Sequence, residues 1–309
     1  MLRRMKRVLS MILLLPLAAC HSLRPTAVAP APAAAGVPDG LYDNHEQVWR
    51  AAGDAAALAP PRLRLQVRSY KGGWQTWRIE PEGGAPATWL MQVAATADGG
   101  QQMTPYRARV AAPKLDPAPD PNEWTALDAC RLSPERPSQS GARLAADAAA
   151  CATIAPGIGA AIAFLPIAVT RADEGIQLRV YADQARGPDA QAQVRRVHWY
   201  GGWAAVNGAG PQASADNRDW HMNRQLRLGN EGGRSALTWR DGTPSGWSLG
   251  LERLTFREGG TPVLKLSIID DADGRVLAYA WADPRAERIG INLGWIQVGL
   301  ERETKETSR

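Results

Sequence analysis

The chain has 309 residues, 45% of them hydrophobic, with 36 Lys and Arg against 31 Asp and Glu and a formal net charge of +5. This length and composition indicate a folded globular protein. After residue 7 no run of Lys or Arg is longer than two residues. Because nucleic-acid binding needs a concentrated basic surface, the sequence argues against a nucleic-acid partner.

The first twenty residues carry four features in order. Residues 3–7 contain four basic side chains and no acidic one, and residues 8–19 are apolar except for Ser10 and Pro16. Leu17-Ala18-Ala19 then leads directly into Cys20. The apolar stretch has the length of a secretory signal and is too short to cross a bilayer as a stable helix.

This pattern resembles the lipobox of bacterial lipoproteins, and the resemblance covers residues 1–20 only. It implies that residues 1–19 are removed and that Cys20 receives a thioether-linked diacylglycerol and usually an amide-linked acyl chain. Two or three acyl chains give durable membrane attachment. His21 stands where an aspartate would favour the inner membrane, which implies the outer membrane, facing the periplasm, in a Gram-negative cell. An ordinary signal peptide followed by an unrelated cysteine is the alternative.

Removal of the signal also changes the charge. It takes away four of the 36 basic residues and none of the 31 acidic ones, which leaves a net charge of +1. The mature protein is therefore close to neutral, and its expected membrane contact is the lipid on Cys20.

Residues 20–42 are rich in alanine and proline and predict a tether, partly in polyproline II conformation. Folding is expected over residues 43–112, beginning with a short helix that Asn44 and Gln47 would cap. Val48, Trp49, Ala52 and Ala56 would share its apolar face. The hydrophobic period then changes to two, and glycine turns separate four predicted antiparallel strands. These strands cover residues 62–68, 74–80, 88–97 and 103–110.

Residues 113–170 interrupt the strand pattern. A proline-rich linker at 113–122 precedes two predicted helices, at 123–132 and 141–152. The apolar stretch 152–169 could be read as a membrane span by length. Its prolines, glycines and alanines favour a buried connection that ends in a strand at residues 164–170.

Cys130 and Cys151 fall one in each of these two helices. An oxidising compartment allows disulfides to persist, and a bond between the pair would close a loop of about twenty residues, worth on the order of 3 kcal/mol. Two buried free thiols are the alternative. No histidine lies near either cysteine in the sequence, so we expect no metal site there.

Residues 171–303 again alternate strands with glycine-containing turns, and residues 304–309 form a tail. This pattern predicts a β-sandwich or jelly-roll-like lobe. The expected fold is therefore mainly β: an antiparallel meander, a short disulfide-linked helical connection and a sandwich. Gly-Gly-Trp occurs at residues 72–74 and 201–203, which leaves a relation between the two β lobes open.

Motifs for serine hydrolysis, zinc peptidase activity, phosphate binding and dinucleotide binding are absent from the sequence. Asp216, Asp219 and His221, with His198 from elsewhere, could supply an acid, a base or a metal ligand. Residues 270–274 could bind calcium. We interpret the first of these segments as a polar loop and the second as a hairpin turn. We therefore predict no metal, no cofactor and no catalytic residue.

Twelve tryptophans against two phenylalanines is an unusual choice of large side chain. An indole has a broad apolar face and one N–H donor, which suits protein interfaces and sugar faces. We expect most of the rings in the core. Trp203, Trp220 and Trp247 lie beside predicted turns and are the candidate exposed binding residues.

The sequence thus favours a non-catalytic envelope lipoprotein that binds an envelope protein or glycan on a β-sheet surface. An inhibitor (immunity) protein or an assembly component is a specific form of this hypothesis. The alternative is an envelope glycan or peptidoglycan hydrolase that uses carboxylates such as Asp216 or Asp219. Two carboxylates facing each other across a tryptophan-lined cleft would favour the hydrolase.

Overall fold

The computed structural model describes ten stretches of the chain. They are residues 36–53, 60–97, 99–115, 118–135, 143–158, 164–172, 174–181, 190–214, 216–256 and 260–304. The predicted signal peptide, Cys20 and residues 21–35 of the predicted tether lie outside the described residues. Residues 33–309 belong to one compact unit.

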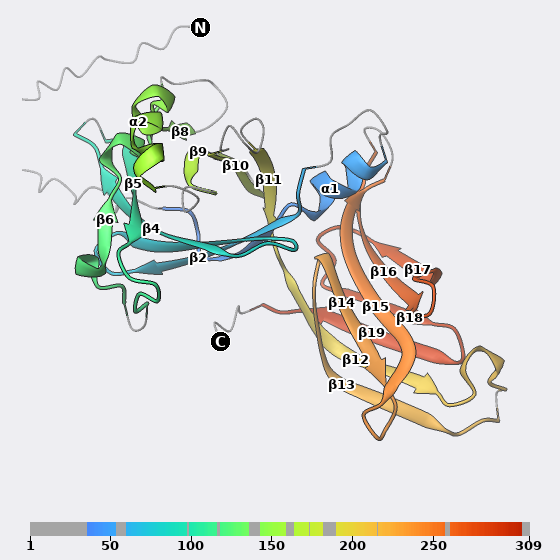
Figure 1. The fold of residues 1–309 in the computed structure, drawn as a ribbon. Helices are drawn as coiled ribbons and strands as arrows, with labels where there is room; N and C mark the ends of the chain where they lie inside the picture. The colour runs from blue at the N-terminus through green and yellow to red at the C-terminus, as the bar shows by residue number, and fades with distance from the viewer. Residues whose placement is uncertain are drawn as a thin grey trace, which may run out of the picture. The chain divides into compact units, whose positions relative to one another are not determined.

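The strands up to residue 196 form one antiparallel sheet that curls into an open half-barrel (Figure 1). In the described residues it has eleven strands, in the order β6-β5-β4-β3-β2-β1-β11-β10-β9-β8-β7. The strands are β1 (Gly40–Asp43), β2 (Leu63–Tyr70), β3 (Trp74–Pro81), β4 (Ala87–Ala95), β5 (Gln101–Ala108), β6 (Trp124–Ala126), β7 (Ser133–Pro134), β8 (Arg143–Ala145), β9 (Pro166–Ala172), β10 (Gly175–Val180) and β11 (Ala190–Arg196). The predicted meander is confirmed as β2 to β5, where each strand pairs with the next.

The fold begins before residue 43, inside the segment predicted as tether. Val37 is 1% exposed within the first hydrophobic core, and the Gln75 side chain bonds both its N–H and its C=O. Strand β1 pairs with β2 on one side and β11 on the other, so it joins the two halves of the sheet. A strand of four residues is too short to show an alternating pattern, and for this reason β1 could not be predicted.

Helix α1 (His45–Ala52) forms where a helix was expected, but its orientation differs from the prediction. Glu46 is its buried residue, whereas Trp49 is 38% exposed. Asn44 makes no side-chain cap. Instead its side chain accepts from the Leu63 N–H and donates to the Pro61 carbonyl, which holds the helix start against β2. The contacts that the Glu46 side chain makes with distant parts of the fold therefore decide which face of the helix is buried, and the apolar side chains do not. Ala56 lies outside the described residues.

Of the two helices expected between residues 123 and 152, the first is absent. Two 3₁₀ turns, η1 (Pro121–Glu123) and η2 (Asp128–Cys130), flank strand β6, whose Trp124 is 2% exposed. Residues 124–126 pair with β5 through backbone hydrogen bonds between strands, which a helix at this position would not make. The second helix, α2 (Ala148–Ile158), begins later than expected because Asp147 caps it by accepting from the N–H groups of Ala149 and Ala150.

The Cys130–Cys151 disulfide is present, as predicted, and joins η2 to α2 within the first core. Both cysteines are buried, at 0% and 1% exposure. The expected strand after the apolar stretch is β9. No helix in the described residues has both the length and the hydrophobicity needed to cross a membrane.

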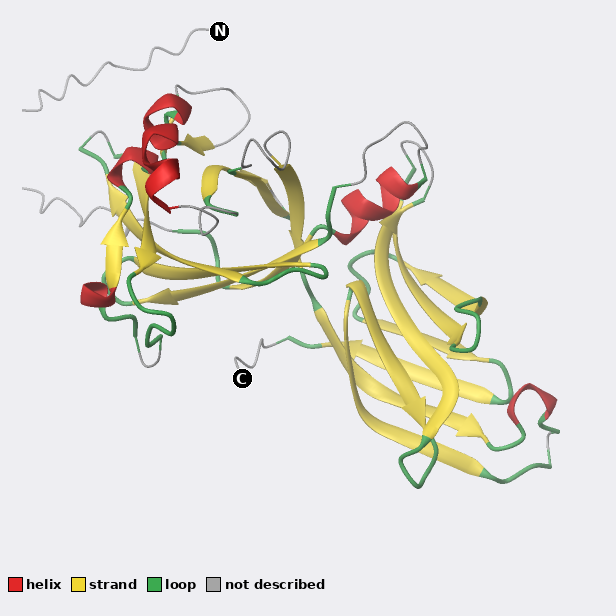
Figure 2. Cartoon of the chain, viewed as in Figure 1, coloured by secondary structure: helices red, strands yellow, loops and turns green. Residues whose placement is uncertain are grey.

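The second part is a sandwich of two antiparallel sheets, confirming the predicted sandwich-like lobe (Figure 2). In the described residues sheet B has the order β13-β12-β19-β18 and sheet C the order β14-β15-β16-β17. The strands are β12 (Trp199–Asn207), β13 (Trp220–Gly229), β14 (Glu231–Thr238), β15 (Pro244–Thr255), β16 (Pro262–Asp270), β17 (Val276–Ala282), β18 (Arg288–Asn292) and β19 (Ile296–Arg302), with the 3₁₀ turn η4 (Gly210–Gln212) after β12.

The structure of this part alters three interpretations of the sequence. The sheets divide after β11, whereas we placed the boundary at residue 171, because β10 and β11 find their partners in β9 and β1. The imperfect alternation of apolar residues over 289–300 predicts one strand, but this segment is a hairpin, β18–β19, that turns at Gly294 with φ +84°. Gly72 and Gly73 form a positive-φ turn, whereas Gly201 and Gly202 lie within β12, so the two Gly-Gly-Trp motifs differ in structure.

Candidate functional site

An open groove crosses the outer face of sheet B, and we name it the Trp203 groove. The groove encloses about 940 Å³, a volume within the range of ligand-binding clefts. Strands β12, β13 and β19 and the loops 216–219 and 293–295 border it. The lining residues are Gly202, Trp203, Ala205, Asn217, Arg218, Trp220, Met222, Arg224, Gln225, Gly294 and Gln297.

The strand register explains why the outer face is hollow at this point. Ala205 of β12 lies between Met222 of β13 and Gln297 of β19, and all three project outward. Outward-facing residues on neighbouring strands form rows across a sheet, so a small residue between two larger ones leaves a depression. Ala205 is the floor of the groove, and Met222, which is 45% exposed, forms part of its wall.

Trp203 stands at one end of this floor. The pairing of β12 with β13 shifts between Gly202 and Ala204, and Gln225 of β13 has φ +64° at this irregularity. On the other side Trp203 pairs with Gly299 of β19, where an added Cβ would lie 3.1 Å from the indole Nε1. The glycine therefore lets the ring lie against the sheet, and the ring is 41% exposed.

Two of the three tryptophans predicted for binding line this groove, and the third does not. Trp203 and Trp220 belong to it, and Trp220 is half-buried. Trp247 lies on β15 of sheet C, where its ring centroid is 5.7 Å from that of Trp239 and 5.0 Å from that of Trp295. Trp247 thus packs against the second hydrophobic core.

The predicted acid and histidine residues do not form one site. Asp219 contacts His221 at 3.3 Å, but the Asp219 side chain is 59% exposed, and His221 Nδ1 accepts the Arg240 N–H. His198 lies before β12 and contacts Arg302, whereas His221 pairs with Val206 near the other end of that strand. In the parts of the chain that the structure describes, no three His, Cys, Asp or Glu side chains form a group that could hold a metal ion.

The acidic segment at residues 270–274 is a hairpin turn between β16 and β17. Asp270 Oδ1 accepts the Ala272 N–H, and Asp273 Oδ1 accepts the Arg275 N–H. Asp271 Oδ1 accepts from Ser248 Oγ at 2.6 Å and from Arg234 at 2.7 Å. These carboxylates are used within the turn and its surroundings, in agreement with the hairpin reading.

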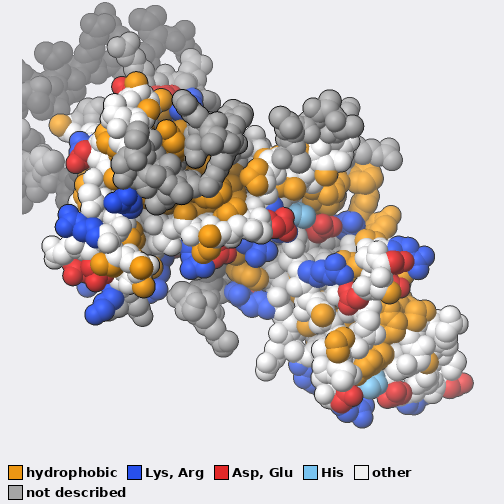
Figure 3. Space-filling model, in the orientation of Figure 1, with side chains coloured by type: hydrophobic (Ala, Val, Ile, Leu, Met, Phe, Trp, Pro, Cys, Tyr) orange, Lys and Arg blue, Asp and Glu red, His pale blue; other side chains and the backbone are white. Residues whose placement is uncertain are grey.

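A second exposed aromatic group lies on sheet C. Tyr279 is 58% exposed and Trp281 45%, their rings stack with centroids 5.5 Å apart, and Phe256 packs on Trp281 at 4.7 Å. Hydrophobic side chains are mixed with charged ones over β16 and β17 in Figure 3. Because these rings are exposed on the other sheet of the sandwich, Tyr279 and Trp281 are suitable control positions for substitutions in the Trp203 groove.

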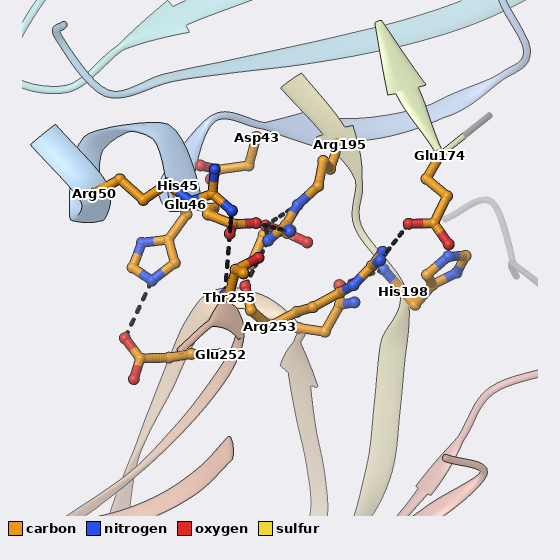
Figure 4. Close-up of polar contacts among 12 residues, drawn as sticks. Asp43, His45, Glu46, Arg50, Glu174, Arg195, His198, Glu252, Arg253 and Thr255 are labelled. Carbon is orange, nitrogen blue, oxygen red and sulfur yellow. Dashed lines mark hydrogen bonds and ion pairs between the residues drawn. The ribbon is translucent and has the colours of Figure 1, made fainter. Parts of the chain in front are cut away.

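Between the half-barrel and sheet C lies a group of buried charges that we name the Arg195 cluster. Figure 4 shows side chains from α1, β11 and β15 pointing toward one another. Arg195 donates to Glu231 Oε2, with Nη2 at 2.7 Å, and forms an ion pair with Glu46. The side chains of Arg195, Glu46 and Glu231 are 17%, 11% and 0% exposed. No local sequence pattern indicates this cluster, because its partners lie 36 and 149 residues apart in the chain.

Further contacts extend the cluster. Arg62 forms an ion pair with the buried Asp43 at 3.1 Å and donates to the Glu231 carbonyl at 2.8 Å. His45 Nε2 lies 3.1 Å from Glu252 Oε1. These contacts link residues of α1, β1 and Arg62, which precedes β2, to residues of β14 and β15, so the cluster joins the half-barrel to the sandwich.

The carboxyl groups of the cluster differ in their pKa values. Burial raises the pKa of Glu231 to about 7 against the opposing charges of Arg195 and Arg253, and its Oε1 has no hydrogen-bond partner among the described residues. Burial also acts on Glu46, but the Thr255 hydrogen bond and Arg195 outweigh it and lower its pKa. The hydrogen bond from His45 lowers the pKa of Glu252.

The raised pKa of Glu231 predicts that the protein becomes more stable as the pH falls from 8 to 5. Because the folded-state pKa lies above the unfolded value near 4.5, the folded state binds the proton more tightly, and the free energy of unfolding increases on the order of 3 kcal/mol across this window. Urea unfolding at several pH values measures the change, and Glu231→Gln should flatten it. Glu80→Gln, at an exposed ion pair, is the control. An unchanged pH profile in Glu231→Gln would contradict the assignment.

Below about pH 4.5 the sign reverses, because Glu46 and Glu252 have lowered pKa values. Their contribution to stability is present above the unfolded pKa and is lost as the pH falls through the folded one.

Comparison with known proteins adds no assignment to these sites: no family model matches the chain, and no curated protein or solved structure is significantly similar to it.

Proposed function

We propose that this protein is a non-catalytic envelope lipoprotein, anchored through Cys20, that binds an envelope protein or glycan in the Trp203 groove. The observation that carries the proposal is the groove itself, where Trp203 and Trp220 border an open hollow on the face of sheet B. Exposed aromatic, Met and Arg side chains are typical of binding surfaces.

The lining of the groove favours binding over hydrolysis. Among the described residues that line it there is no Asp or Glu. Hydrolysis of a glycosidic bond by the usual mechanism needs two carboxyl groups facing each other across the substrate. The alternative of a carboxylate-dependent hydrolase therefore receives no support from this groove.

The anchor gives the first test. Cys20→Ser should abolish incorporation of labelled palmitate and move the protein from the membrane fraction to the soluble fraction, because the acyl chains supply the membrane affinity. Cell fractionation with palmitate labelling measures both effects. Ser22→Ala, two residues later, is the control and should leave both unchanged. Continued labelling of the Cys20→Ser protein would contradict a lipid on this residue.

Photo-crosslinking in living cells tests the groove. A photoreactive phenylalanine analogue in place of Met222 should give a defined adduct with an envelope component, since this side chain is exposed in the groove wall. The added Trp203→Ala substitution should reduce the adduct several-fold, on the order of the loss expected for a binding hot spot.

The same analogue in place of Tyr279, an exposed residue of sheet C, is the matched control. Equal adducts from the two positions, or none from Met222, would contradict a binding role for the groove.

A further inference from the structure

We propose that the ligand of the Trp203 groove is a carboxylated polysaccharide, a sugar chain with repeated carboxylate groups. This inference rests on the function proposed above and names the chemical class of the partner. Three features of the groove carry it: its charge, its free amides and its aromatic faces.

The charge of the groove is positive and unbalanced. Arg218 and Arg224 line it, and neither guanidinium has a hydrogen bond or ion pair with a described residue. No carboxylate is among the described lining residues. A guanidinium binds a carboxylate through two parallel hydrogen bonds, so two free arginines favour a ligand with more than one such group.

The uncharged polar groups are amides. Gln225 and Gln297 line the groove, and their side chains make no hydrogen bond with the described residues. Asn217 uses its Oδ1 to accept the Asp219 N–H at 2.9 Å. A primary amide both donates and accepts, as a sugar hydroxyl does, so these groups match hydroxyls on either side of a sugar ring.

The aromatic ring of Trp203 supplies an apolar face at the end of the groove floor. Trp203 lies against Gly299 on one side and is 41% exposed, and Ala205 leaves the adjoining floor open. The face of an indole carries negative charge density and packs on the polarised C–H groups of a pyranose ring.

The apolar surface is too small for a globular partner. Of the large exposed apolar side chains in the described residues, Trp203 and Met222 line the groove. Stable protein interfaces bury about 800 Å² on each partner and have an apolar centre. An open groove with two such side chains, two arginines and three amides fits a chain-shaped polar ligand better.

Calorimetric titration of the full-length lipidated protein in detergent micelles tests the proposal. The probes are polygalacturonate, the same polymer after methyl esterification, and polyglutamate. We expect polygalacturonate to bind and its ester to bind at least about tenfold more weakly, because esterification removes the charge that the arginines bind. Polyglutamate, which has the charge but no sugar ring, should also bind at least about tenfold more weakly.

Two variants and two controls assign the effect to the groove. Trp203→Ala and the double variant Arg218→Gln with Arg224→Gln should each weaken polygalacturonate binding at least about tenfold. Trp281→Ala and Arg78→Gln remove an equally exposed ring and an exposed arginine elsewhere, and should leave the affinity unchanged.

Equal binding of polyglutamate and polygalacturonate would overturn the inference in favour of an acidic protein segment, and absence of polygalacturonate binding would overturn it outright. If Met222 still crosslinks an envelope component in cells, the proposed binding function stands without this ligand class. If it does not, the proposed function has failed as well.

Discussion

Replacing Arg195 with methionine is expected to lower the free energy of unfolding by about 3–5 kcal/mol. The substitution removes the cation between Glu46 and Glu231 while keeping a long side chain. Glu231 is fully buried and would lose its ion pair, so its charge would be compensated only in part, by the charge of Arg253. Urea unfolding at pH 8 measures the loss.

The pH dependence of this loss separates charge from packing. At pH 5, Glu231 would take up a proton in the variant, so the destabilisation should be smaller than at pH 8. Arg78→Met, at an ion pair that is about half-exposed, is the control and should cost less than about 1 kcal/mol. A loss that is small, or that is the same at both pH values, would show that Arg195 contributes through packing alone.

Removal of the disulfide by Cys130→Ala with Cys151→Ala should cost about 2–5 kcal/mol. The bond joins residues 21 apart in sequence and ties η2 to α2, and both cysteines are buried in the first core. Without it the unfolded chain gains conformational freedom. Alanine is used because it adds no polar group to the buried site.

Urea unfolding of this variant should match that of the wild-type protein with added reductant. A wild-type protein whose unfolding midpoint does not change with reductant would contradict a stabilising disulfide. Changes in the sandwich should be small, since Cys130 and Cys151 contact the first core and not the second.

Much of the fold could be predicted because it follows local patterns. The alternation of Leu63, Leu65 and Val67 with exposed residues gives β2 its buried face, as expected. Asp273-Gly274 forms a hairpin turn, and Gly274 has φ +73°. The failed predictions lie where a short segment has a distant partner. Residues 124–126 pair with β5, and Val37 packs in the core of the half-barrel.

The candidate site was predictable only in part. Trp203 and Trp220 were identified as rings beside turns, but the sequence could not show that they border one groove. The groove depends on the register that sets Ala205 between Met222 and Gln297, from three different strands. Trp247 has a similar local sequence setting and packs inward, because β15 belongs to the other sheet.

The sequence by itself determined the resemblance at Cys20, the mainly β character of the chain and the pair of cysteines available for a disulfide. These depend on residue type and on spacing along the chain. Tertiary structure alone decided which charges are buried and which rings share a surface. Glu46 and Arg195 lie 149 residues apart, and Arg195 and Glu231 lie 36 apart. The burial and charge of each group depend on partners that only the folded chain brings together.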